Sequence, residues 1–333
     1  MEMFVEFKHG NSSDPFGDGD AFSPKLTNVA CTSRGQITLY SIRQQAYQFR
    51  TSTLTVGIFG KVARLFRWDN TGCSITKPID YSTTEGNRHL AGFFRRLNQM
   101  VNEPEARGWD PTVTDATQSE IRDFAEAVNV ACVGQSGPQQ KAHGRKKEAG
   151  GEEEVVDPMF RWLAKSIGDS EKYLRRKVFI LDAGIKKGYI VGYPTSVLKA
   201  PTGRTTRGFV AMSVLTKKLV FLKDTWRPDF DGFQPEDHWY NIFQERGETA
   251  MKNIGAFSYG SDVYATKEFV KCKDKKQRTI THLYAKDLGR VEAMVGYIHH
   301  RVVFSELYLP LEMFRDSKHL TTIMCGIAEG MVP

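Results

Sequence analysis

Hydrophobic positions recur along the chain with two different periods, and each period predicts one kind of element. Short apolar runs with alternating side chains predict strands at residues 3–8, 54–59, 62–68, 74–79, 177–181, 189–193, 209–212, 219–224, 263–265 and 301–305. Apolar residues that return every three or four positions predict helices at residues 35–50, 89–101, 119–132, 159–166, 235–243, 311–314 and 320–328. Because the two kinds of element interleave without an internal repeat, the pattern predicts an α+β fold.

Two polar stretches interrupt this pattern. Residues 9–33 are polar and glycine-rich, and they predict a loop. Residues 134–156 are dominated by Gly, Gln, Lys and Glu, a composition that predicts a disordered linker. The chain of 333 residues is long enough for two domains, so we expect one at 1–133 and another at 157–333.

Charge and cysteine content narrow the class of protein. The net charge of +7 suits an anionic ligand such as a nucleotide or nucleic acid, but scattered surface lysines explain it equally well. Five cysteines without a CxxC pair disfavour a disulfide framework or a zinc site. No apolar stretch approaches 18 residues, and the N-terminus lacks the features of a signal peptide. We therefore expect an intracellular protein, cytoplasmic or nuclear, with no membrane partner.

The stretch from Gly203 to Gly247 carries the first candidate site. A glycine-bearing turn, Gly203–Gly208, precedes two apolar runs that predict a hairpin. Side chains alternate along a strand, so Phe221 and Lys223 share a face near the end of the second run. This arrangement predicts that Lys223 holds a phosphate under the glycine turn and pairs with Glu236 of the next helix, as in the lysine–glutamate pair of kinases.

Longer segments of the sequence resemble the fungal-type protein kinase family. The resemblance rests on "GRTTRGFVAM", "KLVFLKDTWR" and "HHRVVFSELYLPLEMFRDSKHL", and in the first half on "FVEFK", "GQITLYSIRQQAYQFRT" and "ARLFRWDNTGCSITKPIDY". It covers nearly the whole chain outside 134–156. It implies that 157–333 is a kinase N-lobe with the hinge and the first C-lobe helices, that ATP with Mg²⁺ is the cofactor, and that the family phosphorylates protein Ser/Thr. The protein substrate is unknown.

The resemblance also assigns roles to residues. It implies catalytic roles for Lys223 and Glu236. It implies ATP contacts from the glycine turn, the strand after it, the lysine and the hinge, namely Gly203, Arg207, Gly208, Val210, Lys223, Glu306 and Leu307. One departure is Phe221, which stands where kinases carry a small residue and would crowd the adenine.

The motifs for phosphoryl transfer are a second departure from the kinase pattern. Transfer needs an Asp that orients the hydroxyl, and a second Asp and an Asn that hold Mg²⁺. HRD-type and DFG-type motifs are absent, because Asp229–Gly232 matches only in letters and follows the lysine in the wrong order. We therefore expect a nucleotide-binding fragment or pseudokinase without turnover. The alternative is a non-catalytic module that binds nucleic acid or protein.

The first half carries the second candidate site. Glu6 and Lys8 form an E-x-K pattern on the first predicted strand, and Gln36 and Tyr40 follow with QxxxY spacing on a predicted helix. This pattern is similar to part of the PD-(D/E)xK nuclease core, which implies a partial nuclease-like α/β unit in 1–133. The first Asp of that motif has no counterpart here, so we expect nuclease-like ancestry without nuclease activity and no metal ligand set.

Overall fold

The computed structural model describes most of the chain. The described residues are 2–17, 23–134, 162–164, 175–182, 184–196, 198, 200–247, 254–264, 276–287, 294–308, 310–314 and 316–330. The linker predicted at 134–156 lies outside them, apart from Gly134, which ends a helix. The α+β class is confirmed, because helices pack on two separate β-sheets. In the described part, no helix is both long enough and apolar enough to cross a membrane.

Within the described residues, the first sheet has five strands. They are β1 (Phe4–Lys8), β2 (Thr53–Phe59), β3 (Val62–Trp68), β4 (Cys73–Ile75) and β5 (Ile79–Asp80). The order is β1-β2-β3-β4, with β5 also on β3, and only the β1–β2 pair is parallel. A parallel pair needs a crossover connection. Here the crossover is α1 (Asn28–Tyr47), whose Ile37 packs with Phe59 of β2 and Phe66 of β3 on one face of the sheet.

The part of the chain that the structure describes contributes seven strands to the second sheet. They are β6 (Val113–Asp115), β7 (Arg176–Asp182), β8 (Ile185–Pro194), β9 (Arg207–Ser213), β10 (Leu219–Pro228), β11 (Phe257–Asp262) and β12 (Tyr297–Phe304). The order is β11-β12-β10-β9-β8-β7-β6, and every pair is antiparallel. The sheet curls strongly, because Tyr189 of β8 and Tyr259 of β11 share a hydroxyl hydrogen bond although three strands separate them.

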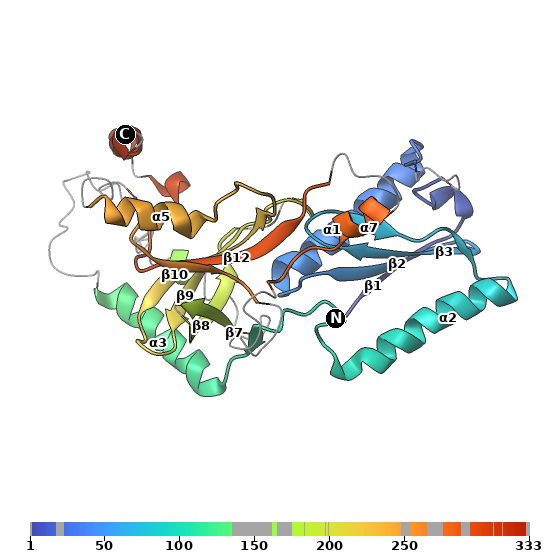
Figure 1. The fold of residues 1–333 in the computed structure, drawn as a ribbon, viewed down its shortest axis with the longest axis horizontal. Coiled ribbons are helices and arrows are strands. Elements are labelled where there is room, and N and C mark those ends of the chain that lie inside the picture. The colour runs from blue at the N-terminus through green and yellow to red at the C-terminus, as the bar shows by residue number, and fades with distance from the viewer. Residues whose placement is uncertain are drawn as a thin grey trace, which may run out of the picture.

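The curl gives the second sheet an inner and an outer face, each with its own core. The inner core is a cluster of buried apolar side chains and includes Phe49, Ile180, Phe209, Leu222 and Val303. The outer face carries α3 (Gln118–Gly134) and α5 (Glu236–Glu245), which lie below and above the sheet in Figure 1. Side chains of α3 pack there with Ile190, Val210 and Met212.

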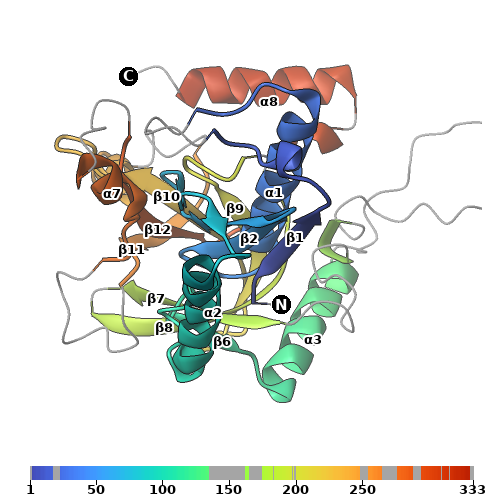
Figure 2. The same cartoon turned by 90° about the vertical axis from the view of Figure 1, so that its right-hand side faces the viewer.

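The remaining helices lie around these sheets. They are η1 (Asn11–Ser13), α2 (Thr84–Gln99), η2 (Met100–Asn102), α7 (Thr281–Asp287), η3 (Leu311–Met313) and α8 (Ser317–Gly330). Helix α2 runs beside the first sheet, and α8 lies at the C-terminal end of the described chain (Figure 2). The helix predicted at 159–166 is described only at 162–164, which are helical.

Several predicted boundaries were wrong. Helix α1 begins at Asn28, within the predicted loop 9–33, because the Thr27 hydroxyl accepts a hydrogen bond from the amide of Ala30 at 3.3 Å. The strand predicted at 263–265 lies at 257–262 instead. The predicted strand at 74–79 is two short strands, β4 and β5.

Strand β6 was not predicted, and it changes the division of the chain. It pairs with β7, so residues 113–115 belong to the second sheet although they precede the predicted linker. Helix α3 packs on the same sheet. The boundary between the two sheets therefore falls before residue 113, whereas the two domains at 1–133 and 157–333 stay a prediction.

Candidate functional site

Lys223 and Glu236 face each other across the outer side of the second sheet. The Lys223 Nζ lies 2.7 Å from both Glu236 carboxylate oxygens. Strand β10 supplies the lysine, and alternation puts it on the outer face together with Phe221. Glu236 is the first residue of α5, where a carboxylate is favoured by the helix dipole. The predicted pairing is present in the structure, while the catalytic role of the two residues stays a prediction.

The glycine turn lies in the connection from β8 to β9, and so precedes the β9–β10 hairpin that carries Lys223. Gly203 has a φ of +88°, in the region that glycine adopts most readily. The amide of Gly203, however, donates a hydrogen bond of 2.8 Å to the carbonyl of Asn70. The Asn70 side chain donates to the Gly203 carbonyl at 3.1 Å and to the Thr205 hydroxyl. The β3–β4 turn of the first sheet thus holds the glycine turn.

The same β3–β4 turn reaches a second segment of the other half. The Asp69 carboxylate accepts hydrogen bonds of 2.9 Å from the amides of Ile280 and Thr281, at the start of α7. The Thr71 hydroxyl donates to the Thr279 hydroxyl at 2.7 Å. One short turn therefore contacts both the glycine turn and the start of α7 through side-chain and main-chain hydrogen bonds, so its geometry and that of the glycine turn are linked.

Phe221 occupies the space beside Gly208. A Cβ atom added at Gly208 would lie only 2.5 Å from Cζ of Phe221, so the glycine is needed for the ring to pack. The ring also lies 6.4 Å from the ring of Phe304, centroid to centroid. Phe221 is thus packed against Gly208 and Phe304, while its effect on an adenine stays a prediction.

The structure does not bring all the predicted ATP contacts to Lys223. Val210 shares the outer face with Lys223, but it is fully buried under α3. Leu307 packs into the same apolar cluster. Glu306 is exposed and accepts a hydrogen bond of 2.6 Å from the Tyr308 hydroxyl. The side chains of Val210 and Leu307 therefore contribute to a core instead of lining an open cleft.

Arg207, a predicted ATP contact, points away from Lys223 in the structure. It pairs with Asp224 on the inner face of the sheet, opposite to Lys223. Its guanidinium also donates to the carbonyls of Gln45 and Gln48 and lies 4.5 Å from the ring centroid of Phe49. The physical reason is register: Arg207 is opposite Asp224, and Gly208 is opposite Lys223, so the two neighbours point to different faces.

Sequence reasoning missed a buried ionic network on that inner face. Arg301 has no exposed surface, and its guanidinium pairs with Asp110 and Asp224. Burial alone would raise the pKa of Asp224, but the charges of His299, Arg207 and Arg301 hold that pKa well below its usual value. Only the pair His299–His300 could have drawn attention to this region, because Asp110 is remote in sequence and carries no local pattern.

A cavity of about 320 Å³ opens next to the Lys223–Glu236 pair. It lies between β10, β12, α5 and the glycine turn. Cationic or aromatic side chains dominate its wall, which includes Arg204, Lys223, Arg227, Trp239 and His300. Arg204 of the glycine turn lines this cavity, whereas none of its lining residues comes from the described segment that follows β12.

The nuclease-like residues of the first sheet also come together. The Lys8 Nζ lies 2.8 Å from the Glu6 carboxylate and donates to the side-chain oxygen of Gln36 on α1. Tyr40 instead stacks on Phe4, with centroids 4.9 Å apart. Among the described residues, no three His, Cys, Asp or Glu side chains are grouped so as to hold a metal ion. The nuclease-like role of this cluster stays a prediction.

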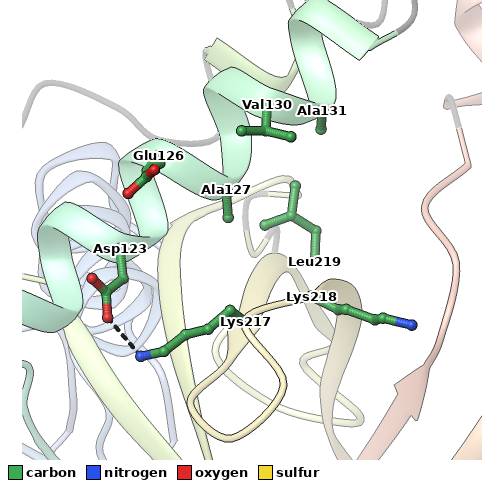
Figure 3. Close-up of a pocket in the computed structure, with 8 residues that line it drawn as sticks. All are labelled: Asp123, Glu126, Ala127, Val130, Ala131, Lys217, Lys218 and Leu219. Atoms are coloured by element: carbon green, nitrogen blue, oxygen red, sulfur yellow. Dashed lines mark hydrogen bonds and ion pairs between the residues drawn. The ribbon is translucent and has the colours of Figure 1, made fainter.

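A separate apolar groove of about 670 Å³ lies between α3 and the β9–β10 turn (Figure 3). Its wall is built from Ala127, Val130 and Leu219. At one end Lys217 reaches Asp123, with Nζ 2.6 Å from the carboxylate, and the Lys218 side chain extends away from the helix. Four charged residues, Asp123, Glu126, Lys217 and Lys218, also line the groove, so it combines apolar surface with ion-pairing groups.

Comparison of the chain with protein-family models, with curated proteins and with solved structures finds no match in any of the three. The resemblance to the fungal-type protein kinase family accordingly remains a prediction.

Proposed function

We propose that the second sheet forms a protein-kinase-like unit that binds nucleotide phosphates at Lys223 and does not transfer them. The observation that carries the proposal is the contact of the Lys223 Nζ with both carboxylate oxygens of Glu236 at 2.7 Å. In protein kinases a strand lysine and a helix glutamate form such a pair, and the lysine then holds the phosphates.

The chain order of the elements supports the proposal. The glycine turn joins β8 to β9, the lysine lies on the next strand, and the glutamate lies on the helix after it. Strands β11 and β12 follow, and β12 pairs directly with β10, so the segment after β12 begins next to the lysine strand. This order agrees with the resemblance, in which a hinge follows the last strand.

ATP fits this site only in part. Its phosphates suit the cationic cavity at Lys223, whereas the adenine position is occupied by Phe221 packed against Gly208. We therefore expect the phosphates to supply most of the affinity and Phe221 to weaken binding of the base. A divalent cation bound with ATP would neutralise phosphate charge, and the described residues offer no group of three carboxylate, imidazole or thiolate ligands for it.

The test is thermal stabilisation by ATP, measured on the wild-type chain and on Lys223→Met. A ligand at a concentration of 100 Kd stabilises the folded state by about 2.7 kcal/mol, which is readily seen as a rise in Tm. We expect the rise in the wild type and its loss in Lys223→Met. The matched control is Lys218→Met, an exposed lysine on the same hairpin, which should respond like the wild type. Phe221→Ala should respond more strongly.

Other outcomes would redirect the proposal. Equal stabilisation of the wild type and Lys223→Met would contradict it. Binding to DNA or RNA that falls steeply with salt and ignores Lys223→Met would support the alternative, a nucleic-acid-binding module. Incorporation of labelled phosphate from ATP into a protein, absent in Lys223→Met, would show catalytic groups that the proposal does not include.

A further inference from the structure

Two cationic side chains of this cavity, those of Arg204 and Lys223, are accessible to solvent. The side chain of Arg204 is 52% exposed, and its Nη2 lies 3.7 Å from the Glu236 carboxylate, too far for a hydrogen bond. The Lys223 side chain is 25% exposed. Arg204 therefore retains donors that a ligand can use, and it lines the same cavity as the lysine.

The charges around the cavity leave an excess of positive charge. Asp262 is shared by Arg227, with hydrogen bonds of 2.8 and 2.6 Å, by Lys276 at 2.7 Å and by His300 at 3.0 Å. Further described carboxylates are Glu236, Asp237, which lies 3.2 Å from His300, and Asp229, which pairs with Arg278 at 2.9 Å. Among these described groups five cations, Arg204, Lys223, Arg227, Lys276 and Arg278, outnumber four carboxylates even with His300 neutral, so the cavity suits an anion.

The first sheet fixes the backbone that carries Arg204. Asn70 binds the residues on both sides of it, Gly203 and Thr205. The Arg204 carbonyl itself accepts hydrogen bonds from the Trp226 amide at 2.9 Å and from the Thr225 hydroxyl at 3.2 Å. A backbone held from two sides loses little further freedom when a ligand binds, which favours affinity.

From these contacts we infer that the cavity binds a polyphosphate group, that Arg204 makes the capturing contact, and that Asn70 is a positioning residue that presents Arg204. The inference rests on the proposed function for the location of the phosphates. It adds the ligand class and a role for the first sheet. A guanidinium presents paired donors that match phosphate oxygens, and a cavity of about 320 Å³ has room for more than one phosphate. Because the side chains supply the positive charge, binding does not require a metal ion.

The test is calorimetric titration with inorganic pyrophosphate in the presence of EDTA. We expect binding to the wild type, at least a tenfold loss in Arg204→Ala and a smaller loss in Arg204→Lys, which keeps the charge but not the paired donors. Asn70→Ala should weaken binding several-fold at unchanged cavity charge. Arg95→Ala, at an exposed arginine of α2, is the matched control and should bind like the wild type.

A second measurement, the Tm, separates a loss of fold stability from a loss of pyrophosphate affinity. If Asn70 only stabilises the fold, Asn70→Ala will lower the Tm but leave pyrophosphate affinity unchanged, which overturns its positioning role. If Asn70→Ala does not fold, the two Arg204 variants decide the phosphate site on their own. Failure of the wild type to bind pyrophosphate overturns the inference, as does equal binding by Arg204→Ala.

Failure of this inference and failure of the proposed function give different results. Stabilisation by ATP that needs Lys223 but ignores Arg204 and Asn70 overturns the inference and leaves nucleotide binding intact. Pyrophosphate binding that needs Arg204, together with no stabilisation by ATP in any variant, keeps the phosphate site and overturns the nucleotide proposal.

Discussion

The two sheets contain the same two kinds of ion pair, but the paired residues are separated by very different distances along the chain. Each sheet has a fully buried arginine and a partly exposed lysine–glutamate pair. In the first sheet, Arg64 donates to both carboxylate oxygens of Asp14 at 2.7 and 2.9 Å, and Lys8 pairs with Glu6 of its own strand. In the second sheet, Arg301 pairs with Asp110, which lies 191 positions away.

The difference in distance changes what each arginine does for the fold. Arg64 also donates to the carbonyls of Phe16 and Thr76, and these partners belong to the segments around the first sheet. Asp110 accepts hydrogen bonds from Thr112 and Gln277, and it also forms an ion pair with Arg301. The second network thereby ties the connection from the first sheet to strand β12, and it fixes how the two halves meet. Four experiments can break or sharpen this comparison.

The largest expected effect is that of Asp224→Asn. It leaves Arg207, Arg301 and His299 around a neutral amide on a buried face. Removing one partner of a buried ion pair costs about 3–5 kcal/mol, because the remaining charge is unpaired. The free energy of unfolding, from urea titration, is the measurement. Asp115→Asn, at an exposed carboxylate, should change it by less than about 0.5 kcal/mol. A similar small change in Asp224→Asn would contradict the importance of the network.

A smaller effect is expected from Asp14→Asn in the first sheet. Arg64 keeps neutral carbonyl partners there, so we expect a loss of about 2–3 kcal/mol, at the upper end for a hydrogen bond to a charged group. Hydrogen exchange locates the effect. Faster exchange should be confined to the amides of β1, β2 and β3. Equal acceleration in β10 and β12 would mean that the first sheet's arginine also secures the second sheet.

The third prediction uses pH, because the outer face of the second sheet carries His300 between two carboxylates, Asp237 and Asp262. Burial lowers the pKa of His300, but Asp237 and Asp262 outweigh burial and raise it above its ordinary value. A raised folded-state pKa gives stability that is fully present below the unfolded pKa, about 6.5, and is lost as pH rises through the raised value. His300→Gln should flatten that loss, while Asp14→Asn should keep it. A wild-type stability that does not fall in this window would oppose the assignment.

The smallest expected effects on stability are those of Lys8→Met and Lys223→Met. Both lysines are partly exposed, and ion pairs of this kind contribute about 0–1 kcal/mol. The two variants should therefore unfold at nearly the same denaturant concentration as the wild type. They differ in ligand response: Lys223→Met should lose stabilisation by ATP, and Lys8→Met should keep it. Loss of the response in both would mean that the first pair also takes part in binding.

The sequence by itself determined the local geometry of both sites. Strand alternation put Phe221 and Lys223 on one face and Glu6 and Lys8 on another, and the structure keeps both arrangements. The first-turn position of Glu236 likewise follows from the helix signal at Pro235. These features depend on residues close together in the chain, whose relative directions are set by the strand and helix periods.

Only the tertiary structure decided which distant segment covers each face. The hydrogen bonds of Asn70 to the glycine turn span 133 positions, and nothing in either segment specifies the other. The inward direction of Arg207 follows from the register of β9 on β10, and β6 joins the second sheet because β7 lies beside it. A residue's own strand fixes the face it points to, but the segment that meets that face is selected by packing and charge pairing over the whole chain, which no local pattern encodes.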